Sequence, residues 1–211
     1  MTYQGDDGVR TWRADARPVS STRTLTTLSW TWDWSSNRLY TVTDGRVLRT
    51  DGVESTPLLR LASLGIAAHS HPYLSPLGHG LLELSNLSQL VVFDATGRIR
   101  TRASLPAGWQ LDGAVATGAD GAIAFEAATQ SRRSFRLYSA FPGGGTQFLG
   151  VYTARPSCAG HWLELRGSSV LVSTEDVTRI YDARSSSAPV DLQPAVRWLK
   201  ARHRSGRPQL L

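Results

Sequence analysis

Short apolar stretches recur along the whole chain, and most either alternate with polar residues or stay apolar for only a few positions. Examples are RLYTVT at 38–43, QLVVFD at 89–94 and SVLVST at 169–174, which are rich in β-branched and aromatic residues. Glycine and Asp-Gly pairs separate such stretches at hairpin distance. The pattern predicts β-strands throughout, and the stretch that fits helical spacing is PAVRWLKARH at 194–203.

The same order of strands and turns occurs four times, in residues 28–52, 71–97, 113–144 and 161–185. Residues of the second strand, taken as markers, are separated by 42, 42 and 47 positions: Leu39, Leu81, Ile123 and Val170. The third strands keep a similar step, at Leu48, Val92, Tyr138 and Ile180. A short fourth strand is expected each time, at 57–61, 99–103, 147–152 and 190–192.

Four strands in each repeat of roughly 40 to 50 residues are typical of the blade of a β-propeller, whereas helical repeats of that length need apolar positions three and four apart. The predicted fold is therefore all-β, a propeller of four four-stranded blades with a partial blade at the N-terminus. The propeller domain is expected over 1–197 and a basic tail over 198–211. The blades are expected at 1–24 (partial), 25–65, 66–108, 109–155 and 156–197.

The N-terminal stretch Val9–Ser20 has the pattern of a third and a fourth strand without the first two. A blade that starts in this way leaves an open sheet edge, which is a template for pairing with another chain. We therefore expect either a homodimer through this edge or a monomer in which Ala195–Arg202 folds back over the gap. A third possibility is that the chain is a piece of a longer propeller with further blades upstream.

Two of the repeats, LSWTWDWSSNRLYTVTDGRVLRTDG and HPYLSPLGHGLLELSNLSQLVVFDATG, resemble the WD40-like repeats of bacterial TolB-type β-propellers. The family's Ser-Pro-Asp-Gly-like turn corresponds to Ser75, Pro76, Leu77 and Gly78 and to Gly118, Ala119, Asp120 and Gly121, while Asp51, Asp94 and Asp182 close third strands. The resemblance implies a non-enzymatic binding ring, in bacteria often outside the cytoplasm. The first residues, MTYQGDDGVR, lack the apolar segment of a signal peptide, so an extracytoplasmic location is expected only if the chain is a piece of an exported propeller.

The composition restricts the class of protein but does not indicate a function. The 211 residues are 41% hydrophobic and 9% aromatic, which is typical of a folded globular chain. A single cysteine, Cys158, excludes an internal disulfide. Most of the net charge of +6 comes from five cations in the last fifteen residues, so Arg202, Arg204 and Arg207 could contact nucleic acid, although a solvated basic end is the simpler interpretation.

Three of the five histidines, His69, His71 and His79, lie within the segment AHSHPYLSPLGHG. On an extended backbone the pair at 69 and 71 would point to one side, as a metal site on a strand requires. Between Glu54 and Glu83 there is no acidic residue to complete or orient such a site. The simpler interpretation is loop histidines near the ring axis, and no metal or other cofactor is expected.

Trp30, Trp32 and Trp34 alternate in WTWDW, so on a strand their indoles would share one face. They could form a platform on which a sugar stacks, but large aromatics at period two more often pack one blade against the next. Asp33 would then lie on the opposite face and, if buried, should have a hydrogen-bond partner.

Nothing in the sequence favours nucleophilic catalysis. There is no Gly-x-Ser-x-Gly turn, and Cys158 with His161 on an irregular stretch fits a small buried residue better than a reactive thiolate. The leading hypothesis is a non-catalytic binding or scaffold module for a protein or peptide partner. The alternative is a propeller-type hydrolase or lyase acting on a small molecule or sugar, with a histidine site near the ring axis.

Overall fold

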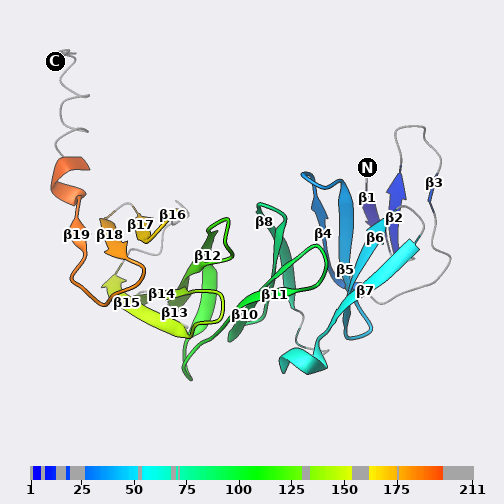
Figure 1. Cartoon of the computed structure of the whole chain (residues 1–211), viewed down its shortest axis with the longest axis horizontal. Coiled ribbons are helices and arrows are strands. Elements are labelled where there is room, and N and C mark those ends of the chain that lie inside the picture. Colours follow the sequence, from blue (N-terminus) through cyan, green and yellow to red (C-terminus); the bar gives the residue numbers. More distant parts are fainter. Residues whose placement is uncertain are drawn as a thin grey trace, which may run out of the picture. The chain divides into compact units, whose positions relative to one another are not determined.

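The computed structural model describes residues 2–5, 8–12, 18–19, 27–51, 54–67, 70, 72–129, 134–153, 162–174 and 176–196, with side chains from residue 29 onward. These residues form antiparallel sheets in which every strand pairs with the one before or after it in sequence (Figure 1). The chain divides into two compact units, residues 1–102 and 103–211, and each is described by itself.

The first sheet has three strands, β1 (Thr2–Gly5), β2 (Gly8–Trp12) and β3 (Pro18–Val19). The sequence predicted two strands here, and β1 is the addition. Its pairing with β2 runs from Thr2 opposite Thr11 to Gly5 opposite Gly8, with two residues between the strands. The strand TYQG carries no apolar alternation, so the hydrophobic pattern could not mark it.

The second sheet contains β4 (Thr27–Asp33), β5 (Arg38–Thr43), β6 (Arg46–Asp51) and β7 (Glu54–Arg60) in that order. Asp44 and Gly45 alone connect β5 to β6, with φ values of 49° and 70°. Positive φ at both central residues is the requirement of a type I′ turn, which an Asp-Gly pair satisfies at low cost. A short 3₁₀ helix, η1 (Ala62–Leu64), follows β7.

The third sheet contains β8 (Tyr73–Gly78), β9 (Leu81–Ser85), β10 (Gln89–Asp94) and β11 (Ile99–Ser104). The sequence placed a turn at Ser75–Gly78, and this was wrong, because those residues belong to β8. The turn is formed by His79 and Gly80, whose φ values are 52° and 70°. Pro76 is tolerated within the strand because β8 is an edge strand and its pairing with β9 shifts register between Pro76 and Gly78.

The fourth sheet opens the second unit with β12 (Gln110–Thr117), β13 (Ile123–Ala128), β14 (Ser134–Ala140) and β15 (Thr146–Thr153). The turn predicted at Gly118–Gly121 is present between β12 and β13. The Oδ1 atom of Asp120 accepts a hydrogen bond from the Ala122 N–H at 3.0 Å, which closes this turn. The backbone N–H of Gly118 donates to the Ala122 carbonyl at 2.8 Å.

The fifth sheet contains β16 (Trp162–Arg166), β17 (Ser169–Ser173), β18 (Thr178–Asp182) and β19 (Val190–Asp191). Residues 193–196 then form a helical turn at the start of the helix predicted for 194–203, and the remainder of that stretch lies outside the described residues. The prediction of an all-β chain with four four-stranded, blade-type antiparallel sheets is confirmed. Each four-stranded sheet runs in simple sequence order, as the blades of a propeller do.

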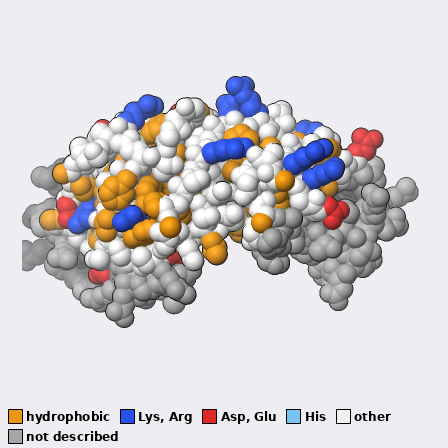
Figure 2. Space-filling view, turned by 90° about the horizontal axis from the view of Figure 1, so that it is seen from below, with side chains coloured by type: hydrophobic (Ala, Val, Ile, Leu, Met, Phe, Trp, Pro, Cys, Tyr) orange, Lys and Arg blue, Asp and Glu red, His pale blue; other side chains and the backbone are white. Residues whose placement is uncertain are grey.

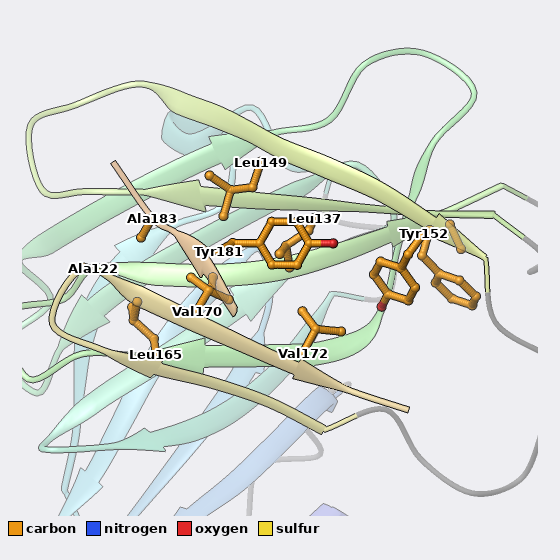
Figure 3. Close-up of a cluster of buried hydrophobic side chains, with 12 residues drawn as sticks. Ala122, Leu137, Leu149, Tyr152, Leu165, Val170, Val172, Tyr181 and Ala183 are labelled. Carbon is orange, nitrogen blue, oxygen red and sulfur yellow. The ribbon is translucent and has the colours of Figure 1, made fainter. Parts of the chain in front are cut away.

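Apolar side chains join the four-stranded sheets in two pairs, one in each unit. In the first unit the cluster draws on the second and third sheets, with Tyr40, Val42, Leu82, Leu84 and Phe93 among its members. In the second unit it draws on the fourth and fifth sheets (Figure 3), with Leu137, Leu149, Val170, Val172 and Tyr181 among its members.

Candidate functional site

The histidine cluster does not form a site in the described residues. His69 and His71 lie outside them, and His79 is an exposed residue of the tight turn between β8 and β9. Across the described residues, no three His, Cys, Asp or Glu side chains lie close enough together to hold a metal ion. The turn geometry accounts for His79 without a ligand.

The three tryptophans do not form one continuous stripe, which corrects the expectation from their spacing. Strand β4 ends at Asp33, so Trp34 lies in the following turn, where 84% of its surface is exposed. The rings of Trp32 and Trp34 still meet edge to face, with centroids 6.0 Å apart. Trp30 and Trp32 are partly buried on the strand, which agrees with a packing role for these two.

Asp33 is the residue that ends β4, and it has the hydrogen-bond partners predicted for it. Its side chain is buried at 7% exposure, and its Oδ1 accepts hydrogen bonds from the Ser35 N–H at 3.0 Å and the Ser35 hydroxyl at 2.7 Å. The Ser36 hydroxyl donates to Oδ2. Burial raises the pKa of Asp33, but these hydrogen bonds outweigh it and hold the pKa below its usual range. The arrangement is an Asx turn, so Asp33 serves the backbone.

The remaining sequence candidates fall on parts of the chain outside the described residues. These are Cys158, His161 and the basic residues Arg202, Arg204 and Arg207. Within the described residues there is no helix long and apolar enough to span a membrane.

Two glutamate side chains on the strands are buried rather than exposed to solvent. Glu83 on β9 is 7% exposed, and burial raises its pKa, an effect that a hydrogen bond from the Ser85 hydroxyl at 2.6 Å only partly offsets. Glu126 on β13 is fully buried and accepts a hydrogen bond from the Tyr152 hydroxyl. Neither carboxylate is open to solvent, so both belong to the core of their sheets.

An open hollow lies at the end of the second sheet, where the β5–β6 turn meets the connection after β7. Its volume is about 490 Å³. Leu61 and Ile66 are buried wall residues at 0% and 2% exposure, while Ala62 and Ala67 lie exposed at its border. Nine residues line it: Asp44, Gly45, Arg46, Arg60, Leu61, Ala62, Gly65, Ile66 and Ala67.

The two parts of the chain that form the hollow are tied together by their backbones. The Leu61 N–H donates to the Gly45 carbonyl at 2.8 Å, which holds the end of β7 against the β5–β6 turn. The 3₁₀ helix then ends at Gly65, which adopts a left-handed conformation with φ of 72° and allows the chain to turn back. Figure 2 shows basic side chains beside hydrophobic ones on one face of the molecule.

Sequence reasoning found the Asp-Gly turn but missed the hollow. Arg46 and Arg60 are opposite each other in the β6–β7 pairing although they lie fourteen positions apart in sequence. The predicted hairpin could have indicated that these arginines lie close together, because the register of two paired strands shows which residues face each other. That register includes a shift between Val47 and Leu48, which the sequence pattern did not reveal.

The chain was compared with known families, curated proteins and solved structures. No known family model matches the sequence, and no curated protein matches it. A similar solved structure is the WD40 domain of SCAP from fission yeast, with 12% identity, 83% of this chain and 43% of that chain covered, and a TM-score of 0.43. Another is the periplasmic gluconolactonase PpgL of Pseudomonas aeruginosa, with 17% identity, 88% and 62% covered, and a TM-score of 0.47.

A third similar structure is an oligogalacturonate lyase in complex with manganese, with 10% identity, 87% of this chain and 70% of that chain covered, and a TM-score of 0.40. The chain spans less than half of the yeast domain and about three fifths of the gluconolactonase. The three structures are a WD40 domain and two enzymes.

Proposed function

We propose that this chain is a non-catalytic binding module that holds a protein or peptide partner in the hollow beside η1. The hollow is the observation that carries this proposal. Its volume of about 490 Å³ lies within the range of pockets that take small ligands or a few side chains. The connection after β7 is tied to the β5–β6 turn by the hydrogen bond from the Leu61 N–H to the Gly45 carbonyl, so little order has to be gained on binding.

The shape of the hollow favours a peptide over an enclosed small molecule. Ala62 and Ala67 are the lining residues that expose apolar surface, since Leu61 and Ile66 are buried. The charged side chains at the border are also exposed: Asp44, Arg46 and Arg60. An apolar centre with a polar rim is typical of protein interaction surfaces. A peptide can place one or two side chains in the centre and leave its backbone at the rim.

The resemblance of residues 28–52 and 71–97 to the WD40-like repeats of bacterial TolB-type propellers supports the same proposal. That resemblance implies a ring that binds a partner without catalysis. We include in the proposal that the chain is a bacterial propeller module of this kind.

Selection from a library of short random peptides displayed on phage tests the proposal with the full chain as bait. Selected peptides should bind the wild-type chain and fail to bind Ala67→Trp, which places a large ring in the hollow from an exposed position. Ala107→Trp, at an exposed position outside the hollow, is the matched control and should bind normally. Failure to select any peptide, or selected peptides that still bind Ala67→Trp, would contradict the proposal.

A further inference from the structure

We infer that the partner is an acidic peptide segment whose carboxylate is bound by Arg46 and Arg60 at the border of the hollow. The inference rests on the proposed peptide-binding function and adds the chemistry of the ligand. It concerns two arginines that the register of β6 and β7 places opposite each other and that form no ion pair with another described residue.

Arg46 on β6 and Arg60 on β7 occupy directly opposite positions of an antiparallel pair. Side chains at such positions project from the same face of the sheet, and like charges there destabilise the pairing. Both side chains are exposed, and neither has an ion-pair partner among the described residues. The folded chain therefore contains a repulsion that a bound anion would relieve.

Two other arginines of the same sheet do form ion pairs. The Nε atoms of Arg38 and Arg49 lie 3.0 Å and 2.9 Å from the carboxylate oxygens of Asp51. Arg49 also donates through Nη1 to the Ala95 carbonyl at 2.9 Å. Arg38 and Arg49 thus have an ion-pair partner within the sheet. Arg46 and Arg60, at the opposite strand ends, line the hollow without an ion-pair partner among the described residues.

The charge balance of the hollow favours an anion. Its lining contains two arginines and one acidic residue, Asp44, and no other charged side chain. A guanidinium presents parallel N–H donors that match the two oxygens of a carboxylate, and two guanidinium groups can share one carboxylate or bind two neighbouring ones.

The apolar part of the lining indicates what should flank the carboxylate. Ala62 and Ala67 are exposed there, next in sequence to the buried Leu61 and Ile66. A ligand that places a carboxylate on Arg46 and Arg60 would place its neighbouring side chain on these two alanines. The favoured ligand is therefore a peptide in which Asp or Glu adjoins an aliphatic residue.

The test uses the phage-selected peptides and the full chain. Each selected peptide is synthesised twice, once as selected and once with every Asp replaced by Asn and every Glu by Gln, and binding is followed by fluorescence polarisation. The amide forms should bind at least about tenfold more weakly, because a charge-assisted hydrogen bond is lost. The difference should shrink as salt is raised, because exposed charges are screened.

Variants of the chain locate the effect. Arg46→Gln and Arg60→Gln should each weaken binding of the acidic form about tenfold and leave binding of the amide form nearly unchanged. Arg102→Gln removes the same charge from an exposed position on β11 and should bind both forms as the wild type does. Circular dichroism of each variant confirms that the sheets are intact.

The outcomes separate the two proposals. Amide and acidic forms that bind equally well, with both lost in Ala67→Trp, would overturn the acidic ligand and leave peptide binding standing. Acidic peptides that bind Arg46→Gln and Arg60→Gln as tightly as the wild type would also overturn the role of these arginines. A selection that yields no peptide would overturn both proposals.

Discussion

The interfaces within the two units differ in how deeply their hydrogen bonds are buried. Between the second and third sheets an apolar cluster includes Tyr40 and Leu82. Two partly buried hydrogen bonds also cross this interface, from the Leu74 N–H to the Ser29 hydroxyl at 3.2 Å and from Arg49 Nη1 to the Ala95 carbonyl at 2.9 Å. The Tyr40 hydroxyl is buried with no hydrogen-bond partner among the described residues. The apolar part of the interface depends on the removal of apolar surface from water, which has no preferred direction.

The interface between the fourth and fifth sheets contains polar groups with defined partners. The Ser139 hydroxyl donates to the Ala183 carbonyl at 2.6 Å, which links β14 to the turn after β18. Within the fourth sheet, Glu126 on β13 accepts a hydrogen bond from Tyr152 on β15, and the pKa of Tyr152 is raised first by burial and then by the Glu126 carboxylate, so the hydroxyl remains a donor. Burial and directional bonding are combined in this interface.

Close packing adds a steric constraint to the same interface. A Cβ atom on Gly150 of β15 would lie 2.9 Å from a ring carbon of Tyr181 on β18. Figure 3 shows the Tyr181 ring among Leu137, Leu149 and Val170. The comparison teaches that blade-type sheets with similar strand patterns can place their hydrogen bonds at different depths, partly buried in the first unit and fully buried in the second. We expect substitutions of the directional groups to separate the two interfaces.

The largest expected effect comes from Glu126→Leu. It leaves the buried Tyr152 hydroxyl without this acceptor, so the free energy of unfolding should fall by about 3 kcal/mol in urea titrations. Adding Tyr152→Phe removes the hydroxyl that lost this acceptor and should recover about 1 kcal/mol of the free energy of unfolding. Replacing both hydrogen-bonding partners with apolar side chains is far less costly than replacing only one of them. A double variant no more stable than Glu126→Leu would show that the hydrogen bond between Glu126 and Tyr152 does not contribute to the difference between the two interfaces.

Gly150→Ala tests the steric constraint and should cost about 2 kcal/mol, because a well-packed aromatic ring must move to accept the methyl group. Gly145→Ala is the matched control, since a Cβ at that position meets no atom within 4 Å and its φ is not in the positive range. Thermal unfolding of both variants gives the comparison. Equal stability of the two would contradict the close approach of Tyr181.

The same chemical change made in both interfaces should have opposite signs. Tyr152→Phe removes a hydrogen-bonded hydroxyl and should lower the free energy of unfolding by about 1 kcal/mol. Tyr40→Phe removes a buried hydroxyl without a described partner and should leave stability unchanged or raise it by up to about 1 kcal/mol. Similar losses in both variants would mean that the Tyr40 hydroxyl also has a hydrogen-bond partner in the folded chain.

The smallest expected effect concerns Glu83, which alternates with Leu82 and Leu84 on β9 and so faces away from the apolar cluster. Burial raises its pKa above the usual 4.5, so the folded state binds this proton more tightly than the unfolded state. Its stabilising contribution is complete below pH 4.5 and is lost as the pH rises through the folded-state pKa.

Glu83→Gln should therefore raise stability slightly at pH 7 and flatten the dependence of stability on pH above 4.5. Urea midpoints measured at several pH values provide the check. An unchanged pH profile would mean that other groups determine it.

Some residues of the candidate site could be predicted from the sequence and others could not. The Asp-Gly turn at Asp44 and Gly45 follows from local backbone preference, because an Asp-Gly pair suits positive φ at both central positions. His79 was considered as a ligand, yet its place in the same kind of turn accounts for it. Arg46 and Arg60 carried no local signal, because their proximity depends on the register between β6 and β7.

The sequence by itself determined the strands, their grouping into four repeats of four and the hydrogen-bonded role of Asp33, because these follow from side-chain alternation and turn preferences over a few neighbouring residues. It did not reveal β1, whose four residues are held by pairing with β2 rather than by apolar alternation. The tertiary structure decided which face of each sheet meets which neighbour. Only then did Glu126 meet Tyr152, Gly150 receive the Tyr181 ring, and Arg46 and Arg60 border one hollow, because each contact joins residues on different strands or sheets.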